Sequence, residues 1–149
     1  MIPIVFVDAN ILIAGSASRT GASRVVLAQA EYGMIQLVVT RQVLDETERN
    51  IRLKLPGALP VLFEHLSYLK IQILDDPELE QYARWLPIIE EKDASILEAA
   101  VQCAPDYLLT LNSKDFTPAV AEATGLLILS PGEFVQRIRH MFSEHLRLN

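Results

Sequence analysis

Four acidic residues occur where a carboxylate could do chemistry: Asp8, Glu46, Asp93 and Asp115. Asp8 follows the apolar run 4–7, which is typical of a strand buried on both faces of a parallel sheet. An acid at the carboxyl end of such a strand lies where open α/β sheets bind their ligands, but it can also cap the next helix. Both interpretations of Asp8 remain open.

Glu46 lies in the acidic run 45–48, and most acids in such a run belong to a solvated surface. On a helical wheel, however, Glu46 sits beside Val43 and Asn50 at the edge of an apolar helix face. A side chain there could reach over the edge of the sheet. Taken alone, Glu46 is better explained as a surface residue.

Asp93 gives a stronger indication of function. At 3.6 residues per turn it shares a helix face with Leu97, Ala100 and Ala104, in the middle of the apolar stripe. Charged side chains seldom point inward without a partner or a metal ion. The alternative is an N-cap, but Ile96 occupies the position where a capping box would have Glu. We therefore favour a functional role for Asp93.

Asp115 follows the fourth predicted strand. A capping role is the weaker explanation here, because Thr117 and Pro118 already make a suitable N-cap and first helical residue. Thr110 and Asn112 bring a hydroxyl and an amide to the same strand end.

All four acids could meet at one edge of the sheet. Carboxylates held together raise one another's pKa unless cations are present, and Mg²⁺ and Mn²⁺ prefer oxygen ligands of this kind. The histidines lack the spacing of a zinc site; they are His65, His140 and His145.

Other chemistries fit less well. The segment 15–21 lacks the Lys of a phosphate-binding P-loop, and neither G-x-G-x-x-G nor G-x-S-x-G occurs. Asn10 stands where an aspartyl-phosphate phosphatase would have its second acid.

Strands alternating with helices predict an α/β fold, a three-layer α/β/α sandwich around a parallel sheet of about five strands. The expected strands are 4–7, 35–39, 70–74, 107–111 and 126–129. The expected helices are 23–32, 41–53, 58–69, 77–87, 93–104, 118–124 and about 131–147. Segment 15–21 is expected to be a loop or a broken helix end. With no linker or repeat in the chain, we expect one domain over residues 1–149.

Composition narrows the function classes. The chain has 149 residues, of which 50% are hydrophobic, and it carries a net charge of −6. This charge argues against nucleic-acid binding through a broad basic surface, but not against an enzyme that binds a phosphodiester through metal ions held by carboxylates. The single cysteine, Cys103, fits a reducing cytosol. No run is long enough to span a membrane and no signal peptide is evident, so we expect a cytoplasmic location.

The motifs resemble those of the PIN-domain nucleases, which include the VapC-type toxins of toxin–antitoxin pairs. The matching pieces are Val7-Asp8-Ala9-Asn10-Ile11-Leu12, Thr40-x-x-Val43-Leu44-x-Glu46, Asp93-x-x-Ile96-x-x-x-Ala100 and Leu109-Thr110-x-Asn112-x-x-Asp115-Phe116. The resemblance implies hydrolysis of RNA with Mg²⁺ or Mn²⁺, and Asp8, Glu46, Asp93 and Asp115 would be the acids. Asn112 departs partly from the pattern, because many members have Asp there, which puts the number of metal ions in doubt.

The resemblance also implies supporting residues and partners. Asn10, Thr110 and Asn112 would be accessory residues that orient water or phosphate. The candidates for RNA contact are Arg19, Arg24, Arg41 and Lys114. An antitoxin protein and a homodimer are the expected protein partners, and the amphipathic last helix is a candidate contact surface. A PIN-like scaffold that binds RNA or protein without cleavage, and a metal phosphoesterase acting on small molecules, remain alternatives.

Overall fold

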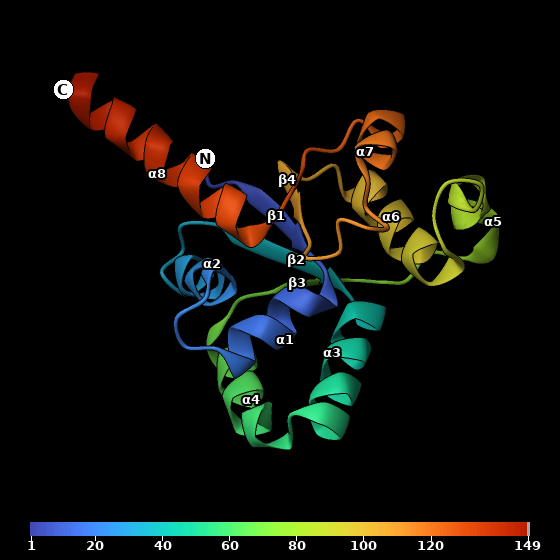
Figure 1. Cartoon of the computed structure of the whole chain (residues 1–149), viewed down its shortest axis with the longest axis horizontal. Helices are drawn as coiled ribbons and strands as arrows, with labels where there is room; N and C mark the ends of the chain where they lie inside the picture. Colours follow the sequence, from blue (N-terminus) through green and yellow to red (C-terminus); the bar gives the residue numbers. More distant parts are fainter. Residues whose placement is uncertain (149) are drawn as a thin grey trace.

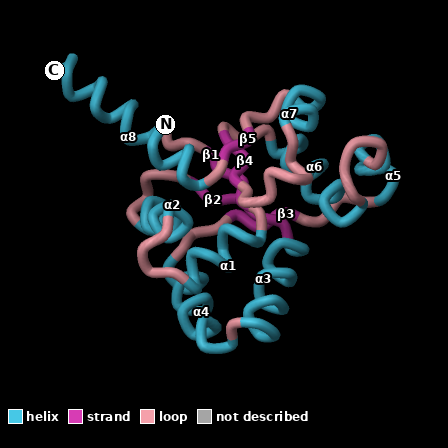
Figure 2. The backbone as a smooth tube through the Cα atoms, in the orientation of Figure 1, coloured by secondary structure: helices cyan, strands magenta, loops and turns pink. Residues whose placement is uncertain are grey.

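Five parallel strands form the centre of the structure, a computed structural model that describes residues 1–148 (Figure 2). The strands are β1 (Ile4–Val7), β2 (Gln36–Thr40), β3 (Gln72–Leu74), β4 (Tyr107–Leu109) and β5 (Ile128–Leu129). Their order in the sheet is β3-β2-β1-β4-β5, and all neighbouring pairs are parallel. The chain therefore changes its direction of winding between β1 and β4, which is where open α/β sheets bind ligands.

Helices cover both faces of this sheet (Figure 1). They are α1 (Ala9–Ala17), α2 (Ala22–Glu31), α3 (Arg41–Lys54), α4 (Leu59–Tyr68), α5 (Leu79–Tyr82), α6 (Glu91–Cys103), α7 (Pro118–Thr124) and α8 (Pro131–Leu148), with short 3₁₀ helices η1 (Pro56–Ala58) and η2 (Ala83–Trp85). Figure 1 shows α1, α3 and α4 together on one side and α6 and α7 on the other. This arrangement confirms the predicted three-layer α/β/α sandwich.

Burial explains why β1 is the central strand. Val5, Phe6 and Val7 have no solvent exposure, as expected for a strand covered by helices on both faces. The register aligns Val7 with Leu109 of β4, so the residues that follow the two strands lie next to each other. The carboxyl ends of β1 and β4 thus bring Asp8 close to Thr110.

The structure differs from the prediction in two segments. The expected helices did not include α1, which continues through Gly15 and Ser16 and ends at Ala17, inside the segment 15–21 that was expected to be a loop or a broken helix end. Gly15 is required by packing, since a Cβ atom there would lie 2.5 Å from a methyl carbon of Leu27 on α2. Sequence patterns do not reveal such a close approach between helices.

The structure does not contain the single long helix that was predicted for 77–87. The structure has the single turn α5, then η2, and Pro77 precedes both. The backbone N–H of Glu78 donates to the Gln81 side chain (2.9 Å), so Glu78 is the N-cap and α5 begins at Leu79, two residues after Pro77. None of the helices in residues 1–148 combines the length and the apolar composition needed to cross a bilayer.

Candidate active site

Asp8 caps α1, which is one of the two roles that the sequence left open, and its second carboxylate oxygen joins β1 to β4. As N-cap of α1, its Oδ1 accepts a hydrogen bond from the Ala9 backbone N–H (2.8 Å). Its Oδ2 accepts hydrogen bonds from the Thr110 hydroxyl (3.0 Å) and the Asn10 amide (3.2 Å). Asn10 in turn accepts from the Leu111 backbone N–H (3.0 Å). This network ties the carboxyl end of β1 to that of β4 and fixes the Asp8 carboxylate between them.

Asp93 lies in the first turn of α6 with only 2% of its surface exposed. It is not the N-cap, because its backbone N–H donates to the Glu90 carbonyl (3.0 Å), and Glu90 is the N-cap residue. Its Oδ2 is buried and has no hydrogen-bond partner within residues 1–148. Burial, followed by the negative charge of Asp8, raises the pKa of Asp93 to about 6. A buried carboxylate oxygen without a protein partner is available to bind an ion or a water molecule.

Asp115 is oriented by Asn112. The Asn112 amide donates to Asp115 Oδ2 (2.9 Å), and the Asp115 backbone N–H donates to Asn112 Oδ1 (3.3 Å). The Asn112 backbone N–H donates to the Thr110 hydroxyl (3.0 Å), so the loop is linked to the Asp8 network. Thr117 caps α7 by accepting from the Val120 N–H (3.3 Å). Asp115 is therefore not needed as a cap, as the sequence had predicted.

Sequence reasoning did not identify Glu90, which forms an acidic cluster with Asp93 and Asp115. Glu90, Asp93 and Asp115 each place one carboxylate oxygen within 4.8 Å of the other two. Oxygen ligands of a magnesium-sized ion lie roughly 3 to 4 Å apart, so small side-chain rotations would let these three bind one ion. The spacing i, i+3 of Glu90 and Asp93 in one helical turn was the available signal. It was overlooked because the helix was expected to start at Asp93, two residues late.

Glu46 faces the same cluster but has a cationic partner. Its Oε1 lies 3.5 Å from Lys92 Nζ, and this charge is the main cause of the raised pKa of Lys92. Glu46 also contributes, after burial, to raising the pKa of Asp8 and Asp93. Asp93 is therefore within electrostatic reach of the other three predicted acids, and Glu46 is also paired with Lys92.

The four predicted RNA contacts lie in different places. Arg19 and Arg24 border a hollow at the end of α1 opposite Asp8, and the Arg24 Nε donates to the Gly15 carbonyl. Arg41 is exposed at the first residue of α3. Lys114 borders a hollow that the acidic cluster also lines.

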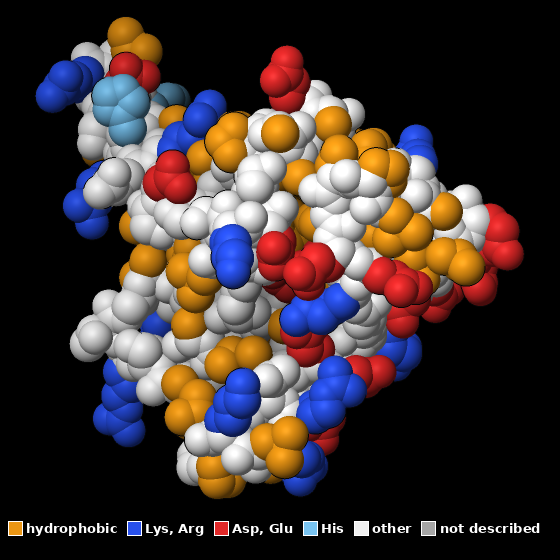
Figure 3. Space-filling model, turned by 45° about the vertical axis from the view of Figure 1, so that its right-hand side comes forward, with side chains coloured by type: hydrophobic (Ala, Val, Ile, Leu, Met, Phe, Trp, Pro, Cys, Tyr) orange, Lys and Arg blue, Asp and Glu red, His pale blue; other side chains and the backbone are white. Residues whose placement is uncertain are grey.

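This hollow adjoins the carboxylates and has a volume of ≈ 390 Å³. It is lined by Leu86, Ile88, Ile89, Glu90, Lys114, Asp115 and Thr117. Figure 3 shows acidic side chains gathered near the middle of the view, next to an apolar area. The candidate site therefore combines negative charge with exposed apolar surface.

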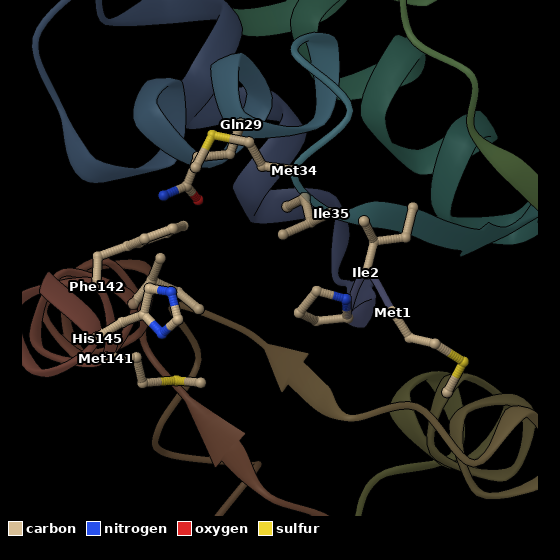
Figure 4. Close-up of a pocket in the computed structure, with 10 residues that line it drawn as sticks. Met1, Ile2, Gln29, Met34, Ile35, Met141, Phe142 and His145 are labelled. Atoms are coloured by element: carbon tan, nitrogen blue, oxygen red, sulfur yellow. The ribbon is translucent and has the colours of Figure 1, made fainter. Parts of the chain in front are cut away.

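A larger pocket of ≈ 540 Å³ lies away from the acids, between the N-terminal residues, the α2–β2 connection and α8. Figure 4 shows Met141, Phe142 and His145 of α8 opposite Met34 and Ile35. Among the residues that line it, none is acidic. This pocket is an apolar surface feature and does not belong to the cluster.

A sequence profile of the PIN domain matches residues 4–114, which is more than half of the chain and includes three of the predicted acids. The chain belongs to the PIN domain family. No curated protein matches it in sequence.

Solved structures show the same PIN-domain fold. The toxin–antitoxin complex from Klebsiella pneumoniae is similar with a TM-score of 0.63 at 21% identity, covering 85% of this chain and 97% of that one. VapBC2 from Rickettsia felis, solved with a promoter DNA fragment, has a TM-score of 0.62 at 17% identity and covers 85% and 98%. VapC20 from Mycobacterium tuberculosis, a toxin that cleaves the sarcin–ricin loop, has a TM-score of 0.52 at 17% identity and covers 80% and 94%.

The acidic cluster of this PIN domain fits a divalent cation by its own chemistry. Its ligands are all oxygens, which suit hard ions such as Mg²⁺ and Mn²⁺. A bound cation would give the partnerless oxygen of Asp93 a partner, and its positive charge would lower the raised pKa values of Asp8 and Asp93.

Proposed function

We propose that this PIN domain is a metal-dependent endoribonuclease that uses Mg²⁺ or Mn²⁺ to hydrolyse RNA phosphodiester bonds. The observation that carries the proposal is the buried, partnerless Oδ2 of Asp93 among other carboxylates. A protein gains nothing in stability from such a group, so a ligand is the physical reason to keep it.

Glu90, Asp93 and Asp115 would hold the ion, and the nearby charge of Asp8 would add to its electrostatic attraction. When bound, it would polarise the phosphate, make an attacking water more acidic and offset negative charge in the transition state. Thr110 and Asn10 hold Asp8 in place for this purpose.

Three further residues have supporting roles in the proposal. Asn112 fixes the direction of Asp115 through two hydrogen bonds. Lys92 limits the total negative charge by pairing with Glu46. Lys114, at the rim of the hollow, would contact an RNA phosphate.

We also propose that this nuclease is the toxin of a toxin–antitoxin pair, acting in the cytoplasm. The support is the likeness of its fold to toxins solved with their antitoxins, together with the apolar pocket beside α8 as a surface for an antitoxin or a second copy. The alternative is a PIN scaffold that binds RNA or protein without cutting.

The test is cleavage of total RNA and of synthetic single strands with Mn²⁺, Mg²⁺ or EDTA. We expect metal-dependent cuts that Asp8→Asn and Asp93→Asn abolish without loss of folding. The matched control is Glu91→Gln, which removes an exposed acid from the same turn of α6. Equal cleavage by wild type and Asp93→Asn would reject the proposal. Metal binding by calorimetry without any cleavage would favour the scaffold.

A further inference from the structure

Leu86 and Ile88 form an exposed apolar shelf beside the acidic cluster. They are 39% and 43% exposed, and both line the same hollow as Glu90 and Asp115 of the acidic cluster. Lys114 lies in the same lining and adds a positive charge. One hollow thus offers apolar contact, a cation and two carboxylates of the proposed metal site.

The backbone holds the shelf in a defined conformation. The Leu86 N–H donates to the Ala83 carbonyl (3.2 Å), and the Ile88 N–H donates to the Trp85 carbonyl (3.0 Å). Both residues therefore belong to hydrogen-bonded turns rather than to a loose connection between α5 and α6.

A buried carboxylate anchors these turns to α6. Glu98 is 2% exposed and accepts hydrogen bonds from Arg84 Nε (2.7 Å), Trp85 Nε1 (2.9 Å) and Gln102 Nε2 (2.9 Å). Arg84 also stacks over the Trp85 ring, 4.6 Å from its centroid. Burial alone would raise the pKa of Glu98, but these hydrogen bonds outweigh it and hold the pKa below its usual value. Glu98 is a positioning residue that links the shelf to α6, whose N-cap is Glu90.

We infer that the apolar shelf binds the base of one unpaired nucleotide of the RNA substrate, next to the phosphate that is cut. This inference rests on the proposed nuclease function and adds a subsite to it. The base would lie on Leu86 and Ile88, and a phosphate of the same nucleotide would meet Lys114. The occupant is RNA because the hollow is continuous with the carboxylates and its cation complements a phosphate.

The chemistry of the hollow determines which RNA it accepts. A base can lie on an aliphatic surface when it is unstacked, as in single strands, loops and bulges, but not inside a duplex. Thr117 is the neutral polar side chain in the lining, and its hydroxyl oxygen already accepts the Val120 N–H. With so little hydrogen bonding to base edges, we expect contact with any base and little discrimination among them.

The test compares two small probes, uridine 5′-monophosphate and ribose 5-phosphate, by calorimetry in the presence of Mn²⁺. They share the phosphate and sugar and differ in the base. Burying roughly 55 Å² of apolar surface changes affinity about tenfold, so wild type should bind uridine 5′-monophosphate about ten times more tightly. The double variant Leu86→Ala, Ile88→Ala should lose this difference. The control Leu79→Ala removes an exposed leucine on α5, outside the lining of the hollow, and should keep it.

The outcomes separate this inference from the function on which it rests. If wild type cuts RNA but the double variant binds uridine 5′-monophosphate as tightly as wild type, the subsite is wrong and the nuclease proposal stands. If wild type binds neither probe and cuts no RNA, both are wrong. If the double variant loses the preference for the base and cuts single-stranded RNA more slowly at low substrate concentration, the subsite is supported.

Discussion

Substituting Asp93 by Asn should make the metal-free protein more stable. The carboxylate is buried, one of its oxygens has no partner within residues 1–148, and its pKa is raised from 3.8 to about 6. A carboxyl group whose pKa is higher in the folded state binds more protons folded than unfolded between those two values. Stability therefore falls as the pH rises through this range, and the cost is complete at pH 8.

The raised pKa sets the size of the effect. A shift from 3.8 to about 6 corresponds to an upper limit of ~3 kcal/mol of destabilisation by the ionised form. The substitution recovers only part of it, because the Asn amide also leaves a buried polar group without a partner at this position. We therefore expect Asp93→Asn to gain about 1 to 2 kcal/mol at pH 8, or roughly 3 to 6 °C in melting temperature for a chain of this size.

Urea denaturation in EDTA measures the effect. At pH 8 Asp93→Asn should be more stable than wild type, and at pH 4 the difference should shrink because wild-type Asp93 is then protonated. Added Mn²⁺ should stabilise wild type and leave Asp93→Asn nearly unchanged. Glu91→Gln, which removes a nearby exposed charge, should behave like wild type in both respects. Equal or lower stability of Asp93→Asn in EDTA at pH 8 would refute the reasoning.

Two further predictions concern packing and the Glu98 anchor. Glu98→Gln should lower the free energy of unfolding by about 1 to 3 kcal/mol at pH 7, because Arg84 loses its buried carboxylate partner. Since the pKa of Glu98 is lowered in the folded protein, this advantage of the wild type should disappear as the pH falls below 4.5. A difference in urea titrations that does not change with pH would contradict the prediction. Gly15→Ala should lower the free energy of unfolding by about 1 to 3 kcal/mol because its Cβ meets Leu27. The control Gly57→Ala, with no described atom within 4 Å of the new Cβ, should be neutral or slightly stabilising. Equal melting temperatures for the two variants would argue against the close approach of α1 and α2.

The sequence predicted the fold because alternating apolar runs and helical stripes are local signals. The order of the strands is not local, since it depends on which runs pair across more than one hundred residues, as Val7 and Leu109 do. Helix α1 was absent from the expected helices, and its continuation through Gly15 is not a local signal either, because glycine is a poor helix former and its place there is set by contact with a second helix.

The site was predictable where a residue broke a local pattern. Asp93 interrupts an apolar stripe, and Asp8 ends a buried strand, so both could be identified. Glu90 breaks no pattern, because an exposed acid before a helix is ordinary, and only the three-dimensional structure brings it to Asp115. Arg19 and Arg24 were candidates by charge alone, and the structure places them at the far end of α1.

The double role of Asp8 has an evolutionary consequence. Its carboxylate begins α1 and joins β1 to β4, so its replacement by an apolar residue would cost stability as well as activity. Asp93, in contrast, caps no helix, and its buried charge lowers the stability of the folded protein. Under the proposed nuclease function, a descendant that no longer cuts RNA would lose Asp93 early and keep Asp or Asn at position 8. The pair of residues at these two positions would then distinguish working nucleases from inactive descendants among the relatives of this protein.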